Sequence, residues 1–111
     1  MMTYKDPDGK VLSAEEWSSM FEDRSENSVW MKARAESEIQ YKEESIKVST
    51  VWLGMSFGGD LGQFETMVFS TDSNKDYESF TRRYRTRQES LEGHFEITKE
   101  ITDMLVEADH A

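Results

Sequence analysis

The chain of 111 residues contains only two histidines, and one of them, His94, falls inside a predicted helix. Ser90 precedes it by about one helical turn, so a contact between the serine hydroxyl and the imidazole is geometrically available. A nucleophilic pair also needs an orienting carboxylate and an oxyanion site, and the sequence identifies neither. We therefore assign no catalytic residue and expect His94 to serve in packing or in a backbone hydrogen bond.

Charged residues around a predicted strand form a second candidate site. Glu65 lies in an otherwise apolar segment, where a cross-strand ion pair with Arg83 or Arg85 is its simplest role. Arg83, Arg85 and Arg87 belong to the only basic cluster, and strand alternation places them on one face. They predict either charge balance within an acidic surface or a small contact site for an anion or a partner. Together with Glu65 and His94, they define an alternative hypothesis, a small-ligand-binding protein or an enzyme.

A glycine-rich turn at 57–62 is the third candidate. It lacks the glycine spacing of nucleotide-binding loops, and no Lys-Ser or Lys-Thr pair follows it, so phosphate binding is not expected. An exposed loop that contacts a partner fits this composition better, with Phe57 and Leu61 as apolar anchors beside Asp60.

No metal ion or cofactor is predicted. The absence of cysteine excludes disulfides, thiol nucleophiles and cysteine-based zinc sites. Asp6, Asp8 and Glu15 fall at the spacing of calcium ligands around Gly9, but Tyr4 occupies the place of the first ligand. The segment 6–9, Asp-Pro-Asp-Gly, is typical of a type I turn instead.

The net charge of −10, from 23 acidic and 13 basic residues, disfavours direct binding to nucleic acid or to anionic lipid. Such acidity serves solubility in most proteins, whereas a sharper interpretation is an acidic mimic that occupies the basic groove of a nucleic-acid-binding protein. The N-terminal segment does not resemble a signal peptide, and no apolar run approaches the roughly 20 residues of a membrane span. These features predict a cytoplasmic protein without a membrane segment.

The segment 48–69 has two apolar, β-rich runs around the glycine-rich turn and predicts a central hairpin with strands at 45–54 and 63–70. Further strands are predicted at 29–38, where helix is the open alternative, and at 77–85. Capping boxes at Ser13 and Thr86 open helices that end near 23 and 108. Gly93 interrupts the second helix and predicts a close helix–sheet approach. The sum is one α+β domain over 1–111, a four-stranded antiparallel meander with a short N-terminal helix and a longer C-terminal helix packed on it in two layers.

Several segments resemble a family of small bacteriophage and prophage proteins: VSTVWLG at 48–54, FETMVF at 64–69, RYRT at 83–86 and EGH at 92–94. The resemblance covers most of the chain, but Met55 and Ser56 stand where relatives usually carry an Asp-His pair. It implies no established activity, cofactor or catalytic residue. It does imply an accessory product that acts in the cytoplasm of the infected bacterium and is not part of the virion.

The sequence therefore predicts a small, acidic, non-enzymatic protein that binds a host or phage protein, as a host-takeover or anti-defence factor in the infected cell. Homo-oligomer formation through Trp30 or Trp52 is a further alternative.

Overall fold

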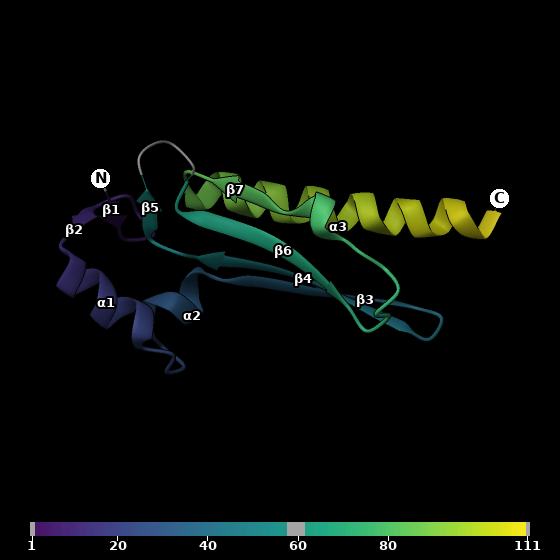
Figure 1. Cartoon of the computed structure of the whole chain (residues 1–111), viewed down its shortest axis with the longest axis horizontal. Helices are drawn as coiled ribbons and strands as arrows, with labels where there is room; N and C mark the ends of the chain where they lie inside the picture. Colours follow the sequence, from purple (N-terminus) through teal and green to yellow (C-terminus); the bar gives the residue numbers. More distant parts are fainter. Residues whose placement is uncertain (1, 58–61, 111) are drawn as a thin grey trace.

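The computed structural model describes residues 2–57 and 62–110 and shows an elongated molecule, 51 Å long and 30 by 24 Å across. In the described part, three α-helices and a single 3-10 turn accompany two separate sheets (Figure 1). The elements in chain order are β1 (Met2–Lys5), β2 (Val11–Leu12), α1 (Ala14–Glu22), α2 (Val29–Ala33), β3 (Ala35–Tyr41), β4 (Glu44–Trp52), β5 (Met55–Phe57), β6 (Phe64–Ser70), η1 (Glu78–Phe80), β7 (Arg82–Tyr84) and α3 (Arg87–His110).

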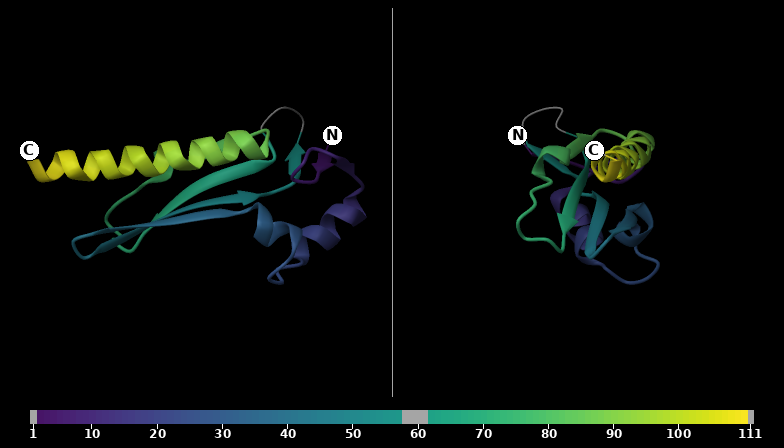
Figure 2. Two further views of the ribbon diagram at one scale, coloured as in Figure 1. Left: turned by 180° about the vertical axis from the view of Figure 1, so that it is seen from behind. Right: turned by 90° about the vertical axis from the view of Figure 1, so that its right-hand side faces the viewer.

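The larger sheet has four antiparallel strands in the order β3-β4-β6-β7, which follows the chain. The long helix α3 runs along one face of this sheet, and Figure 2 shows this layering from behind and from one end. The predicted α+β class, the four-stranded meander and the longer C-terminal helix on the sheet are confirmed. α1 and α2 lie at the end of the sheet where the N-terminus is found (Figure 1).

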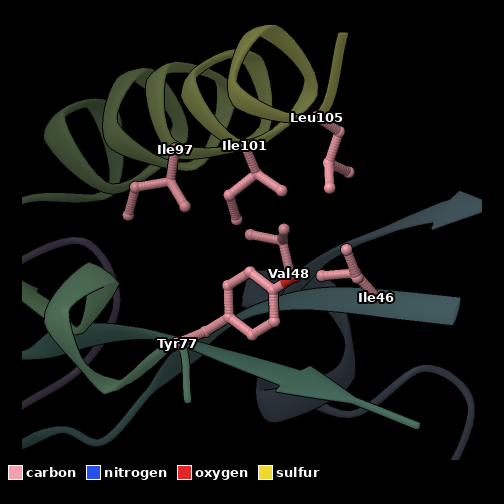
Figure 3. Close-up of a cluster of buried hydrophobic side chains, with 6 residues drawn as sticks. All are labelled: Ile46, Val48, Tyr77, Ile97, Ile101 and Leu105. Atoms are coloured by element: carbon pink, nitrogen blue, oxygen red, sulfur yellow. The ribbon is translucent and has the colours of Figure 1, made fainter. Parts of the chain in front are cut away.

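The first core cluster lies between α3 and the sheet, where alternate residues of β4 point toward the helix. Figure 3 shows the helix residues Ile97, Ile101 and Leu105 directed toward Ile46 and Val48 of β4. Tyr77 closes the cluster from the segment that leads into η1. Gly93 lets α3 approach β7 as predicted, because a Cβ at this position would lie within 3.0 Å of the Tyr84 ring.

The second core cluster lies at the N-terminal end of the molecule. There Trp52 and Phe64 pack against Trp17 and Phe21 of α1. The Ser13 capping box that opens α1 is confirmed, as is the turn of 6–9, in which the Gly9 amide donates to the Asp6 carbonyl. Three residues that the sequence assigned to the glycine-rich loop or its approach instead form β5, which pairs with β1 in a small sheet of order β2-β1-β5.

Two predicted strands are partly wrong. Residues 29–33 form α2, because the Ser28 hydroxyl accepts a hydrogen bond from the Met31 amide and caps a helix, so that the strand begins only at Ala35. The segment 77–85 contributes η1 and only three strand residues, since the Tyr77 ring turns into the core instead of continuing the sheet.

The two tryptophans that the sequence offered as interface residues differ in position. Trp52 is fully buried, and its indole N–H donates to the Lys5 carbonyl at 3.0 Å, so it cannot form an interface. Trp30 is half-buried at the surface, where the guanidinium of Arg24 lies 3.8 Å from its ring centroid.

Candidate functional site

His94 is buried at the interface between α3 and the main sheet, with 2% of its surface exposed. Its Nε2 lies 2.8 Å from the Ser37 hydroxyl on β3, and its Nδ1 lies 2.7 Å from the Thr50 hydroxyl on β4. Thr50 in turn lies 2.5 Å from the hydroxyl of Thr66 on β6. We call these four residues the polar chain. Burial lowers the pKa of His94, so the imidazole is neutral at pH 7.

The hydrogen-bond partners of His94 are those of a histidine with a structural role. Both ring nitrogens are occupied by hydroxyls of buried or half-buried side chains, and Ser90, one turn earlier, donates its hydroxyl to the Arg87 carbonyl and not to the imidazole. A nucleophilic serine would need its proton directed to the histidine. The arrangement therefore fixes the register between α3 and three strands.

Glu65 lies on the opposite face of the sheet from His94. Neighbouring residues of a strand point to opposite faces, and Thr66 belongs to the polar chain beneath α3. Glu65 pairs across the strands with Arg83 at 3.5 Å, which confirms the cross-strand ion pair expected for it. The structure therefore does not bring Glu65 and His94 into one site.

The three arginines of the predicted anion site are divided between two places. Arg83 also donates to the carbonyl of Gly62 at 3.1 Å, next to its ion pair with Glu65. Arg85 and Arg87 line a pocket of about 250 Å³ at the start of α3, together with the loop that carries Asp8. Arg87 lies 3.7 Å from the Asp8 carboxylate, which offsets its charge.

The predicted partner-binding loop lies mostly outside the described residues. Asp60 and Leu61 fall in 58–61, and Phe57 is the last residue of β5, where it is the register partner of Met2. Asp6, a residue of the calcium alternative, accepts hydrogen bonds from the amides of Asp8 and Lys10 and so stabilises its own turn. In residues 2–57 and 62–110, no group of three or more acidic or histidine side chains could hold a metal ion. Over the same residues, no helix has the length and apolar character to cross a bilayer.

A row of carboxylates along α3 was not recognised in the sequence. Its members are exposed and recur every three or four residues, which places them on one side of the helix. We call this set the acidic row: Glu89, Glu92, Glu96, Glu100, Asp103 and Glu107. It faces the β7 side of the sheet, where Arg82 donates to Glu96 and to Glu100 at 3.5 and 3.1 Å.

The charge spacing of the acidic row is wider than that of a nucleic acid backbone. At 1.5 Å per residue, its six carboxylates extend over about 27 Å, or one charge for roughly every 5 Å. One strand of B-form DNA carries a phosphate for about every 3.4 Å of helix axis. Arg82 and Lys99 offset part of this charge, so the net field of the row is weaker than that of a phosphate backbone.

A buried carboxylate, Glu44, lies at the far end of the sheet beside a surface pocket of about 360 Å³. It accepts hydrogen bonds from the hydroxyls of Ser70 and Tyr77, and the Lys75 ammonium lies 2.6 Å away. Burial raises the pKa of Glu44, but the hydrogen bonds from Lys75, Ser70 and Tyr77 outweigh it and hold this pKa below its usual value. Since its partners occupy both oxygens, Glu44 stabilises the fold and is not a free acid.

Comparison with protein-family models, with curated protein sequences and with solved structures finds no match for this chain. The resemblance to phage and prophage proteins thus stays a prediction.

Proposed function

We propose that this chain is a small, non-enzymatic accessory protein of the infected bacterial cell whose acidic row binds a basic surface of a host or phage protein. The observation that carries the proposal is the position of the row on α3. The helix forms the outer layer of the molecule (Figure 2), and every member of the row is exposed. A basic partner can therefore approach six carboxylates along one rigid element.

The spacing of the row favours a nucleic-acid-binding protein as the partner. Carboxylates at roughly 5 Å intervals on a straight helix present charges in a line, as a phosphate strand does. A protein whose lysines and arginines follow a nucleic acid backbone is suited to such a line. The acidic mimic thus becomes the specific form of the proposal.

The alternative, a small-ligand-binding protein or an enzyme, has less support. It requires Glu65, His94 and the arginines in one concave site, whereas Glu65 and the polar chain lie on opposite faces of the sheet. The arginine pocket at the start of α3 contains Asp8, which opposes the binding of an anion.

Capture from a bacterial lysate with matched charge variants tests the proposal. The row variant replaces Glu92, Glu96, Glu100 and Glu107 with glutamine. The control variant replaces four exposed glutamates outside α3, Glu15, Glu22, Glu26 and Glu43, with glutamine. Both variants remove four negative charges from a net charge of −10, so they differ only in where the charge is lost.

We expect the wild type and the control variant to retain the same stoichiometric partner, identified by mass spectrometry, and the row variant to lose it. Duplex DNA should displace the partner. Retention of the partner should also fall steeply as salt is raised from about 50 to 200 mM, because forming the ion pairs releases counterions and this release is less favourable at high salt. Equal retention by the row variant would refute a role of the acidic row. Retention that resists DNA but follows the row would refute the mimic and leave a basic protein partner.

A further inference from the structure

An apolar pocket of about 490 Å³ lies between the C-terminal part of α3 and the segment that contains η1. Its most buried lining residues are Leu105 and Tyr77, which belong to the first core cluster (Figure 3). Met104 of α3 and Phe80 of η1 line the pocket nearer the surface. The volume is in the range that is typical of ligand pockets, roughly 300–1,000 Å³.

The walls of the pocket are fixed on one side and adaptable on the other. The rings of Tyr77 and Phe80 lie 6.1 Å apart, and the Tyr77 hydroxyl donates a hydrogen bond to Glu44 at 3.0 Å, which holds the ring in place. Met104 is 42% exposed and unbranched, so its side chain can follow the shape of an inserted group. An aromatic or large aliphatic side chain can therefore bury apolar surface here without a rearrangement of the core.

Two carboxylates beside the pocket have no cation near them. Glu107 lies three residues after Met104 and is its neighbour on the surface of α3. Asp76 lines the pocket, and its carboxylate accepts a hydrogen bond from the Glu78 amide at 2.8 Å. Among residues 2–57 and 62–110, neither Glu107 nor Asp76 forms an ion pair.

The one lysine that lines the pocket does not reverse this negative charge. The ammonium of Lys75 lies 2.6 Å from the buried carboxylate of Glu44, which offsets it. The C-terminal end of α3 at His110 adds negative potential, because the last carbonyls of a helix have no intrahelical partner. The pocket therefore favours an occupant that carries positive charge over an anionic ligand.

We propose that this pocket receives one aromatic or large aliphatic side chain of the basic partner, from a segment in which lysine or arginine flanks that side chain. The inference rests on the proposed function, because Met104 lies between Glu100 and Glu107 of the acidic row on the helix surface. Exposed ion pairs each contribute little to affinity, whereas an apolar side chain in a pocket can contribute much of it. The pocket also fixes the position of the partner along α3.

A second copy of the chain is less suited to the pocket. Its candidate anchor is Trp30, which has Lys32 two residues away and the guanidinium of Arg24 at 3.8 Å from its ring centroid. The exposed carboxylates of Glu22 and Glu26 lie in the same segment and oppose an approach to Glu107. Each copy also carries a net charge of −10, so the two copies repel each other.

Methyl NMR of the full chain with blocked five-residue peptides tests the proposal. The probe has a central tryptophan between two pairs of lysines. One control has glycine in place of the tryptophan, and the other has glutamates in place of the lysines. We expect the probe to bind at least tenfold more tightly than either control and to shift the methyl signals of Met104, Leu105 and Ala108, which line the pocket.

Exposed-methionine variants distinguish the pocket from general attraction to an acidic protein. Met104→Gln places a polar amide in the wall and should remove the preference for tryptophan over glycine. Met67→Gln is the matched control and should keep the preference, because Met67 is 41% exposed on the sheet face opposite α3. Ala108→Trp, which fills the pocket from another position, should also remove the preference.

The row variant separates this proposal from the proposed function. It should weaken both lysine peptides, because it removes the charges of Glu100 and Glu107, but it should keep the preference for tryptophan. Lysine peptides that bind the row variant as tightly as the wild type would refute the acidic row. In the lysate capture, Met104→Gln should reduce the retained partner at least tenfold and Met67→Gln should not.

Three outcomes overturn the pocket proposal. Equal binding of the tryptophan and glycine peptides would exclude an apolar anchor, as would a preference that survives both Met104→Gln and Ala108→Trp. Equal binding of the glutamate peptide would exclude a basic occupant. Shifts of the pocket methyl signals that grow with protein concentration in the absence of peptide would identify the occupant as a second copy.

Discussion

Gly93 offers the sharpest test of the packing between α3 and the sheet. The glycine lies in the middle of α3, where alanine would ordinarily raise the free energy of unfolding by about 1 kcal/mol through helix propensity. Here a Cβ would lie within 3.0 Å of three atoms at the end of the Tyr84 ring, Cε1, Cζ and the hydroxyl oxygen. Overpacking of this kind lowers the free energy of unfolding by roughly 1–3 kcal/mol.

The clash should outweigh the gain in helix propensity. Tyr84 is held on β7 opposite Phe64, and its half-buried ring packs against the second core cluster, which restricts its movement away from Gly93. We therefore expect Gly93→Ala to lower the free energy of unfolding by about 1 kcal/mol. Leucine at position 84 lacks the three clashing atoms, so in a Tyr84→Leu background the same change should raise it by about 1 kcal/mol.

Urea unfolding of the wild type, both single variants and the double variant measures this reversal of sign. The cycle should give a coupling of about 2 kcal/mol between positions 84 and 93. If Gly93→Ala stabilises the wild-type background as much as the leucine background, α3 does not approach β7 as closely as the structure has it. The explanation of the glycine would then be refuted.

Three further predictions concern buried polar groups. The pKa of His94 is lowered by burial, so the unfolded chain takes up its proton near pH 6.5 before the folded chain does, and stability should fall below that pH. Glu44→Ala should lower the free energy of unfolding by about 1–3 kcal/mol, because the buried Tyr77 hydroxyl loses its acceptor. Ser28→Ala should lower it by about 1 kcal/mol through loss of the hydrogen bond from the Met31 amide.

The controls use exposed positions next to these groups. In the same urea titrations, Glu43→Ala and Asn27→Ala should change the free energy of unfolding by no more than about 0.5 kcal/mol. For the pH prediction, His94→Gln should flatten the stability profile between pH 8 and 5, whereas His110→Gln should leave the slope in place. A wild-type profile that is flat in this range would contradict the neutral, buried imidazole.

Local signals predicted the parts of the fold that depend on short stretches of sequence. The capping serine at Ser13 and the apolar stripe of α3 each lie within a few turns of chain, and both elements form as expected. β5 could not be predicted in this way. It has only three residues, and it forms because β1, more than fifty residues earlier, supplies its hydrogen-bonding partner.

Residues 29–33 show how two valid patterns compete. Val29, Met31 and Ala33 alternate with polar or bulky residues as in a strand, and this pattern favoured the wrong prediction. The helix that forms here is only about one turn long. It is stabilised by the Ser28 cap and by the burial of Ala33 in the second core cluster. The alternation then continues into β3, where it does describe a strand.

The candidate sites also differ in whether a short stretch of sequence is enough to predict them. The acidic row is visible in the sequence once residues 87–108 are assigned to a helix, because its spacing is that of one helix face. The polar chain is not visible, since Ser37, Thr50 and Thr66 come from three strands whose register brings them to His94. The separation of Glu65 from His94 follows from the predicted strand itself, because neighbouring residues of a strand point to opposite faces of the sheet.

One geometric relation explains why both sides of α3 have exposed side chains. Four strands place the outer axes of the sheet about 14 Å apart, whereas a helix with its side chains is about 10–12 Å wide. A single helix therefore covers the centre of the sheet, and its two sides project over β3 and β7. On the β7 side, Arg82 binds the projecting carboxylates. On the β3 side, Ser37 contacts His94, and Tyr41 and Lys42 contact Asp109, while Phe95 and Val106 between these contacts stay exposed.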